Sequence, residues 1–395
     1  MTRSTLLSLV GLVLVSLASS QTVDPSLQDL ANRNADFAAR LYRSVSSRTD
    51  DNVFLCPFTL ATGLSALLGA TSGSTQDQLL RGLSLNGLDP QSLPELVQSL
   101  RNLVLQGSLS MNLMQGMAVF PAQSLKVSPS YLEQVQTNFG GNSLSVDYTV
   151  PQEATDTINR WVQDNTGDQI QELVTSLDPQ TQLLLATAAS YQIRFSPSFN
   201  ASLTQDERFY VDKYHVAIVP MMFQADKFFL AYDRALKAGV LKLPMNDGAA
   251  MLVVLPDEGI DITAVEEEVN GEKIRAWIRQ LKKTKLEVQL PRFLLERSYT
   301  LRDALRILNI TQVFQDDADI INIGETTGLK LTQVYHKSVM TVDESTDDIT
   351  AGGGVNAFST LPPRLTINRP FLFVIYQQTS SSVLFMGRVT DPTKK

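Results

Sequence analysis

The stretch that decides the fold covers residues 339–376 and reads VMTVDESTDDITAGGGVNAFSTLPPRLTINRPFLFVIY. It opens with the pattern of a strand at 339–342 and closes with an apolar run at 371–376 that also reads as a strand. The roughly twenty residues between them are polar or glycine-rich and cannot pack a core of their own, and long loops in compact domains are usually functional. The sequence therefore predicts an exposed loop at about 344–363, held between two strands.

Outside this stretch, the spacing of apolar residues changes about halfway along the chain. The expected helices cover residues 27–47, 57–68, 75–106 in patches, 150–177, 262–280 and 299–308, and the main expected strands cover 52–55, 111–119, 183–195, 214–224, 228–233, 238–243, 249–255, 285–293, 329–342, 364–367, 371–377 and 382–389. Helices dominate the first half and strands the second, which indicates an α+β protein with mainly antiparallel sheets. No linker or repeat divides the chain, so we expect a single domain over residues 21–395.

The first twenty residues have the layout of a secretory signal. Arg3 supplies a positive charge, residues 6–15 form an apolar run, and small residues at 18–20 precede Gln21. The run is too short to cross a bilayer core of about 30 Å as a helix. We therefore expect residues 1–20 to be cleaved off and the mature chain to be secreted into the extracellular space, with no membrane partner.

The composition excludes further classes of protein. Of the 395 residues, 43% are hydrophobic, which allows a substantial core, and the net charge of −8 argues against a nucleic-acid partner. The one cysteine, Cys56, cannot form an internal disulfide. Its apolar neighbours at 53–58 favour a buried small side chain over a reactive thiol. We expect a monomeric extracellular protein.

The sequence contains no recognisable catalytic or metal-binding set. The two histidines, His215 and His336, both lie in strand patterns without a nucleophile motif nearby. One cysteine and two distant histidines do not make a zinc site. Glycines 352–354 lack the lysine and the following helix of a phosphate-binding loop. The sequence therefore predicts a protein that is not an enzyme and holds no metal.

Basic residues cluster at Arg279, Lys282, Lys283 and Lys285. Two interpretations stay open: a site for heparin or another polyanion, or a solvated helix end where cations meet the helix dipole favourably. Four charges produce only a modest field, which favours the helix end. Apart from such a polyanion, the sequence predicts no cofactor.

Two sequons for N-linked glycosylation begin at Asn200 and Asn309, since each asparagine is followed two residues later by Ser202 or Thr311. A secretory signal would bring both to the glycosylation machinery. We therefore expect glycans on Asn200 and Asn309 wherever the surrounding loop is exposed.

The loop and the strands after it resemble the C-terminal signature of the serpins. The matching elements are Val342-Asp343-Glu344 as a hinge, the loop itself, Arg369-Pro370-Phe371 and Phe385-Met386-Gly387-Arg388-Val389, preceded by blocks at 52–57, 158–162, 219–222, 252–256 and 291–293. Because these motifs follow the family's order along the mature chain, the chain is identified as a member of the serpin family. The resemblance implies a serpin fold of class α+β, with three β-sheets, about nine helices and an exposed reactive-centre loop.

The resemblance also implies a function, which is suicide inhibition of an extracellular serine protease. The protease attacks the loop and forms an acyl-enzyme. The cleaved loop then inserts into the central sheet as a new strand and carries the protease to the far pole, where its active site is deformed.

Within the family, the nearest resemblance is to the antitrypsin-like plasma group, and in it to the protein Z-dependent protease inhibitors. It is carried by residues 211–216, 219–222, 241–244 and 357–359. It implies a cofactor protein similar to protein Z and a target protease of the chymotrypsin or coagulation type. Met245 departs from this pattern, because those inhibitors have an aromatic residue there.

The loop retains the pattern of a strand that could be inserted. Every second residue from Asp347 to Ala357 is apolar or glycine, apart from Asp347 itself. Successive side chains of a strand point to opposite faces, so this set forms the inward face of an inserted strand.

Three peptide bonds of the loop are candidates for cleavage by a protease. Family spacing from the following prolines places it at Ser359-Thr360, and spacing from the hinge places it at Thr360-Leu361. Cleavage after Phe358 or Thr360 keeps the apolar face inside, and Phe358 suits a chymotrypsin-like primary pocket. We therefore predict that Phe358-Ser359 is the reactive bond.

The hinge and the facing strand depart from the family's pattern. Inhibitory serpins have Gly, Thr and an alanine run after the hinge glutamate, whereas this hinge contains Glu344, Ser345, Thr346, Asp347, Asp348, Ile349 and Ala351. Insertion would bury Asp347, and an unpaired buried carboxylate costs on the order of several kcal/mol. Ser190 replaces an asparagine, and residues 190–199 lack the tryptophan that packs where the loop enters the sheet. These departures favour an alternative function: a non-inhibitory serpin that carries a small apolar ligand or acts as a binding partner.

Overall fold

Two long parallel strands lie side by side at the centre of one sheet. The computed structural model describes residues 23–106, 112–321, 323, 328–345 and 362–395. In this part of the chain, five strands form what we call the central sheet, in the order β10 (Phe293–Thr300), β11 (Gln333–Val342), β4 (Leu183–Gln192), β2 (Leu113–Pro121) and β3 (Asn142–Ser143). β11 and β4 are parallel to each other, and their outer neighbours β10 and β2 run antiparallel to them.

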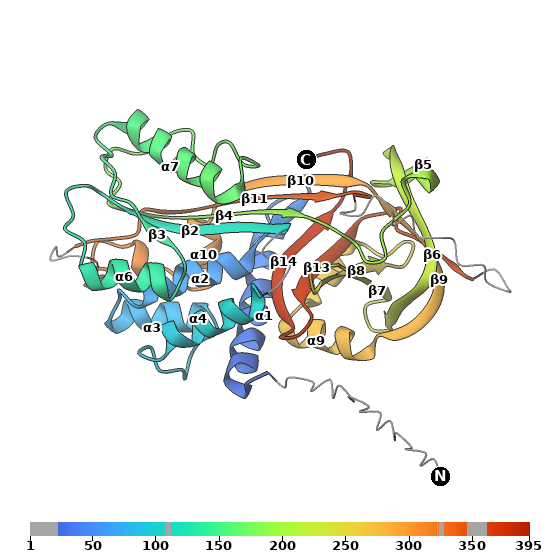
Figure 1. Cartoon of the computed structure of the whole chain (residues 1–395), viewed down its shortest axis with the longest axis horizontal. Coiled ribbons are helices and arrows are strands. Elements are labelled where there is room, and N and C mark those ends of the chain that lie inside the picture. The colour runs from blue at the N-terminus through green and yellow to red at the C-terminus, as the bar shows by residue number, and fades with distance from the viewer. Residues whose placement is uncertain (1–22, 107–111, 322, 324–327, 346–361) are drawn as a thin grey trace, which may run out of the picture.

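Helices cover both faces of the central sheet (Figure 1). α7 (Pro151–Thr166) packs on one face, where the Trp161 ring meets the Phe120 ring edge-on at 5.7 Å. α2 (Pro57–Leu68) packs on the other face, and all of its residues are buried. Because both faces are covered, β4 is buried at every position except the last, which explains why its sequence is a continuous apolar run.

The other nine strands form one hydrogen-bonded path. Its order is β1 (Val53–Leu55), β14 (Ser382–Val389), β13 (Phe371–Gln377), β8 (Ala249–Pro256), β7 (Ala238–Pro244), β6 (Val216–Asp233), β9 (Lys282–Pro291) and β12 (Arg364–Thr366), with β5 (Gln205–Tyr210) beside β6. β6 is 18 residues long; its first part pairs with β5 and its last part with β7. The path thus comprises two sheets that share β6 and β9, and with the central sheet these make the three sheets expected.

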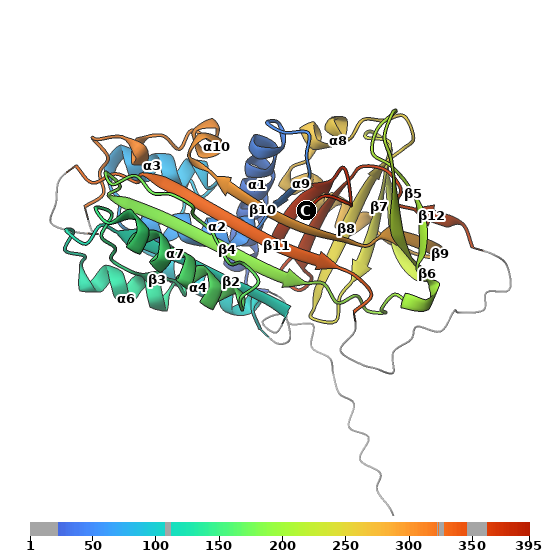
Figure 2. The same ribbon diagram turned by 90° about the horizontal axis from the view of Figure 1, so that it is seen from above.

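Nine α-helices lie in the part of the chain that the structure describes. Besides α2 and α7 they are α1 (Pro25–Ser46), α3 (Gly73–Gly82), α4 (Leu93–Val104), α6 (Pro129–Thr137), α8 (Ile262–Glu268), α9 (Gly271–Gln280) and α10 (Arg302–Ile307), with short 3-10 helices η1 (Ala201–Leu203) and η2 (Gln312–Phe314). Figure 2 shows α3 and α6 toward one end of the molecule and β5, β6 and β9 toward the other. The α+β class predicted from the sequence is confirmed.

Two of the predicted helices are shorter than their apolar patterns indicated. The helix expected at 150–177 ends at Thr166, because Gly167 has a left-handed backbone (φ 56°) that terminates α7. The helix expected at 262–280 is divided at Asn270, whose side chain accepts a hydrogen bond of 2.8 Å from the backbone N of Lys273 and so begins α9. Capping interactions therefore set these boundaries.

Candidate functional site

β11 leads directly into the predicted loop and is paired with β4 along almost its whole length. Nine residue pairs are in register, from Gln333–Leu184 to Thr341–Gln192. Among the described residues, no strand lies between β11 and β4. The central sheet is therefore closed, and a strand inserted at this position would have to separate all nine pairs.

The hinge carboxylate Glu344 is clamped by residues from two other parts of the chain. Arg292, between β9 and β10, donates from Nε to Oε2 (2.9 Å) and from Nη2 to Oε1 (2.7 Å). The hydroxyl of Thr204, after η1, also donates to Oε1. The Glu344 side chain is only 6% exposed. Burial acts to raise the pKa of Glu344, but the hydrogen bonds from Arg292 and Thr204 outweigh it and hold the pKa below its usual value.

The last residue of β4 reaches the residues on either side of Glu344. The Gln192 side-chain amide lies 3.3 Å from Oδ1 of Asp343 and 3.3 Å from the hydroxyl of Ser345. The backbone N of Ser345 donates to the same Asp343 carboxylate (2.9 Å). Gln192, Thr204 and Arg292, which we call the hinge clamp, thus hold residues 343–345 at the open end of the β11–β4 pair.

The chain is anchored again where the described residues resume after the loop. The backbone N of Glu287 donates to the carbonyl of Pro363 (3.0 Å), and β12 pairs in parallel with β9. Arg364 forms an ion pair of 2.7 Å with the Glu287 carboxylate and lies over the Phe223 ring. Both ends of the predicted loop are therefore attached to the three-sheet framework.

The loop itself lies outside the described residues. This includes the predicted reactive bond Phe358-Ser359, the alternatives up to Leu361, and the hinge residues Thr346, Asp347, Asp348, Ile349 and Ala351. The predicted signal peptide, residues 1–20, lies outside them as well. These assignments stay predictions.

Two phenylalanines pack together in the segment that lacks the family's tryptophan. The rings of Phe195 and Phe199 meet edge-on at 5.4 Å, and both side chains are buried. Phe195 also forms a β-bridge to Met245, and the nearby Tyr191 hydroxyl donates to Asp247 (2.7 Å). Sequence reasoning noted the missing tryptophan but not this aromatic pair, which the Phe-x-x-x-Phe spacing could have indicated.

Neither histidine belongs to a catalytic arrangement in the described part of the chain. His336 is fully buried on β11; its Nε2 accepts a hydrogen bond from the backbone N of Cys56 (3.0 Å), and its Nδ1 lies 2.9 Å from the Thr187 hydroxyl. Burial lowers the pKa of His336 to about 3. His215 is exposed and is held by the Asp212 carboxylate at 2.6 Å in a surface turn.

Burial also determines the pKa of the Cys56 thiol. The thiol is fully buried at the start of α2, 3.1 Å from the Thr59 hydroxyl. Burial raises the pKa of Cys56 to about 11. It is therefore a poor nucleophile in the folded protein.

The two sequons differ in their surroundings. Asn309 is exposed in a turn after α10 and has a left-handed backbone (φ 61°). Asn200 is half-buried and its side chain accepts hydrogen bonds from the backbone N (2.9 Å) and hydroxyl (2.8 Å) of Ser202. Glycosylation stays a prediction at both positions, and Asn309 is the more accessible.

The helix-end interpretation of the basic cluster is wrong for its three lysines. α9 ends at Gln280, so Arg279 lies in its last turn, whereas Lys282, Lys283 and Lys285 all belong to β9. Side chains on a strand alternate between two faces. Lys282 therefore points to the opposite face of β9 from Lys283 and Lys285, and binding of a polyanion by the cluster stays a prediction.

The described residues contain no group of three His, Cys, Asp or Glu side chains arranged to hold a metal ion. None of the described helices has the length and apolar composition needed to cross a membrane.

Comparison with known proteins defines the class to which this fold and hinge belong. The sequence matches the family described as Serpin (serine protease inhibitor) over residues 32–392. The chain belongs to the serpin family, and the fold predicted from the resemblance is confirmed.

Its relatives include the protein Z-dependent protease inhibitor of Homo sapiens, which is 31% identical over 374 residues, covering 93% of this chain and 84% of the relative. The crystal structure of the mouse protein Z-dependent protease inhibitor matches with a TM-score of 0.86 at 29% identity, covering 93% of this chain and 100% of that one. Human thyroxine-binding globulin in complex with thyroxine matches with a TM-score of 0.83 at 28% identity, covering 93% and 99%. The family and the two protein Z-dependent inhibitors support a protease inhibitor, whereas thyroxine-binding globulin fits the alternative of a ligand carrier.

Proposed function

We propose that the chain is a secreted suicide inhibitor of an extracellular serine protease of the chymotrypsin or coagulation type, and that it offers the bond Phe358-Ser359. The observation that carries the proposal is the parallel pairing of β11 with β4 immediately before the loop. A cleaved loop that folds back from β11 would run antiparallel to both strands. It would replace one parallel ladder with two antiparallel ladders, which are more stable per residue.

The hinge clamp supports the same mechanism. Arg292, Thr204 and Gln192 bind the side chains of residues 343–345 and hold the first residues of the loop at the edge of the closed pair. Cleavage frees the other end of the loop from β12, so the hinge clamp and the β11–β4 pairing are then what resists insertion. The clamp would thus keep the uncut protein in the state that a protease attacks.

We extend the proposal to a cofactor protein similar to protein Z. The segment 211–216, which carries the resemblance, leaves Tyr214 88% exposed at the turn between β5 and β6, beside exposed Val216 and Ile218. Apolar side chains gathered on a surface are typical of a protein-binding site. Binding of purified protein Z to the wild type and to Tyr214→Ser, compared by calorimetry, would test this part separately.

The inhibitor proposal is tested on a denaturing gel after the purified protein is mixed separately with chymotrypsin, factor Xa and factor XIa. An SDS-stable complex, with a new N-terminus at Ser359 found by mass spectrometry, is the expected result. The matched variant Phe358→Arg should lose the complex with chymotrypsin and form one with trypsin, because the primary pocket of trypsin prefers a cation. A nicked chain without a complex, and without a rise in Tm after nicking, would contradict the proposal.

A second candidate, a ligand carrier, is favoured by one cavity. A space of about 530 Å³ lies between α9 and the β6–β7 turn, lined in part by Tyr232 and Trp277. Thyroxine-binding globulin, with a similar fold, was crystallised with thyroxine. However, Asp233, Arg234 and Lys273 also line the cavity, so it suits a polar ligand better than the small apolar one expected from the sequence.

A further inference from the structure

The dipeptide Asn-Gly occurs twice in the sequence, at Asn86-Gly87 and at Asn270-Gly271. In such a pair the backbone nitrogen of the glycine can attack the side-chain carbonyl carbon of the asparagine, because glycine has no Cβ that obstructs the approach. Ammonia leaves, and a cyclic succinimide remains in the main chain. The two pairs lie in different surroundings, so the fold determines which of them reacts.

Asn86-Gly87 occupies an exposed turn between α3 and α4. The backbone N of Leu88 donates to the carbonyl of Leu85 (3.1 Å), and Gly87, the third residue of this turn, has φ 85°. Both Asn86 and Gly87 are exposed, and a Cβ added at Gly87 would meet nothing within 4 Å. In the part of the chain that the structure describes, no hydrogen bond engages the Asn86 carboxamide or the Gly87 backbone N. Neither reacting group must give up a partner before they meet.

Asn270-Gly271, by contrast, is held by the start of α9. The Asn270 side chain accepts a hydrogen bond of 2.8 Å from the backbone N of Lys273 and so caps the helix. Gly271 is buried, and a Cβ added there would lie 2.2 Å from the Asp36 carboxylate, which covers this glycine. Attack on Asn270 would break the cap and move the first turn of α9 away from Asp36. The fold thus protects one Asn-Gly pair and leaves the other accessible.

A cation beside the exposed turn can select the product of the reaction. Arg33 of α1 donates from Nη1 to the backbone carbonyls of Asn86 (3.0 Å) and Ser84 (3.0 Å). Its Nε binds the Asp29 carboxylate (2.7 Å), which orients the guanidinium. Arg33 therefore polarises the backbone carbonyl of Asn86, and that carbonyl becomes one of the two carbonyls of the succinimide.

The carbonyl that water attacks determines which residue is formed. Attack at the backbone carbon of Asn86 leaves this carbon as a free carboxylate and routes the main chain through the side-chain carbon, which gives isoaspartate. Attack at the side-chain carbon gives aspartate. Arg33 activates the first carbonyl and then binds the new carboxylate through a charge-assisted hydrogen bond, which is stronger than the bond to the original carbonyl.

We propose that Asn86 is a site of spontaneous deamidation and that Arg33 directs the reaction to isoaspartate. In the first step the bond from Asn86 Cγ to its amide nitrogen breaks, a bond from Cγ to the Gly87 nitrogen forms, and the proton of that nitrogen leaves with the ammonia. In the second step water adds its hydroxyl to the Asn86 backbone carbon and returns a proton to the Gly87 nitrogen. One water is consumed and one ammonia is released, so the turn gains a negative charge and a backbone methylene without any oxidant or cofactor.

The test is incubation of the full-length protein at mildly alkaline pH, both folded and in urea, followed by peptide mapping of the two Asn-Gly pairs by mass spectrometry. In the folded protein Asn86 should deamidate at least severalfold faster than Asn270, whereas in urea the two rates should converge. Asn86→Gln should lose the acidic product of the folded protein, because the larger ring that glutamine would form closes far more slowly. Equal rates at the two asparagines in the folded protein would overturn the proposal, as would reaction of Asn86 in urea only.

The role of Arg33 is tested by the share of isoaspartate, measured by enzymatic methylation of its free carboxylate. A synthetic peptide of residues 83–89 gives the share without a fold. Arg33→Met should lower the share from the wild-type value to that of the peptide, and Arg33→Lys should restore part of it. Arg43→Met serves as the control, because Arg43 lies on the same helix but donates to the carbonyl of Glu267 (3.1 Å). An unchanged share in Arg33→Met would refute the directing role, and none of these measurements depends on protease inhibition.

Discussion

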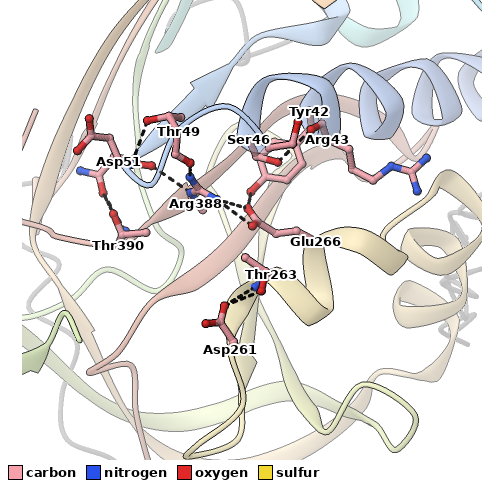
Figure 3. A network of polar contacts seen from close by, with 12 residues as sticks. Tyr42, Arg43, Ser46, Thr49, Asp51, Asp261, Thr263, Glu266, Arg388 and Thr390 are labelled. Atoms are coloured by element: carbon pink, nitrogen blue, oxygen red, sulfur yellow. Dashed lines mark hydrogen bonds and ion pairs between the residues drawn. The ribbon is translucent and has the colours of Figure 1, made fainter. Parts of the chain in front are cut away.

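Arg388 of β14 and Glu266 of α8 form a buried ion pair, with Arg388 Nη1 2.8 Å from Oε2 and 3.1 Å from Oε1 of Glu266 (Figure 3). Their side chains are 3% and 6% exposed. The Tyr42 hydroxyl of α1 donates to the same carboxylate, and Arg388 also donates to the carbonyls of Thr49 and Asp51. The pair therefore joins the C-terminal strand to the first helix and to α8.

Removal of one partner of this pair should be strongly destabilising. Arg388→Met leaves the Glu266 carboxylate buried without its cation, and we expect the free energy of unfolding to fall by about 3–5 kcal/mol. Urea denaturation followed by fluorescence measures the change. The control Lys394→Ala, which breaks an exposed pair of 3.9 Å with Asp51, should cost about 1 kcal/mol or less. Equal losses in the two variants would contradict the role assigned to the buried pair.

Release of the hinge clamp should make the β11–β4 pair easier to open. Arg292→Ala removes two charge-assisted hydrogen bonds from Glu344; because Arg292 is 44% exposed, we expect a loss near the lower end of the usual range, about 1.5 kcal/mol. A synthetic peptide with the sequence of residues 345–358 should insert faster into this variant, as measured by native gel. Arg364→Ala breaks a comparable ion pair away from the hinge and serves as the control. Peptide uptake that is equally fast in both variants would count against the clamp.

The stabilisation that the hinge clamp provides should be lost as the pH falls. The pKa of Glu344 is lower in the folded protein than its usual value, so the stabilisation is fully present above the unfolded pKa of about 4.3 and is lost as pH falls through the lower folded pKa. The difference in Tm between wild type and Arg292→Ala should therefore be constant near neutral pH and should shrink as pH falls below the unfolded pKa of about 4.3. A difference that grows on acidification would refute this linkage.

Buried His336 should make stability fall at mildly acidic pH. In the unfolded chain it binds a proton below about pH 6.5, whereas in the folded protein its pKa is about 3. The unfolded state thus binds more protons between these values, and stability should decrease by up to about 1.4 kcal/mol per pH unit as pH falls through this window, with no effect above it. His336→Gln should flatten the profile measured by urea denaturation from pH 4 to 8.

The Phe195–Phe199 pair should stabilise the segment at the open end of the β11–β4 pair. A double-mutant cycle with Phe195→Leu and Phe199→Leu keeps most of the apolar volume and removes the edge-to-face contact at 5.4 Å. We expect a coupling energy of about 0.5–1.5 kcal/mol, measured by urea denaturation. If the two losses were simply additive, the rings would be independent of each other.

Local patterns in the sequence predicted most of the elements of this fold, and the family resemblance predicted their arrangement. Most helices and strands occur where the spacing of apolar residues predicted them. The motifs placed the hinge at Glu344 and the start of the following strands near 364 and 371. The division at Asn270 and the end of α7 at Gly167 were missed, because a capping side chain and one left-handed residue outweigh a continuing apolar pattern.

The sequence by itself determined the family, the α+β class and the position of the hinge, because each depends on residues that are adjacent or regularly spaced along the chain. The reactive bond Phe358-Ser359 stays a prediction from the same kind of pattern. Only the tertiary structure decided which distant residues meet: Thr204 and Arg292 at Glu344, and Arg388 at Glu266. These contacts depend on strand order and register, and a shift of one residue would send each side chain to the opposite face. The local alternation of apolar residues indicates that a residue lies on a strand, but it does not indicate which strand lies beside it.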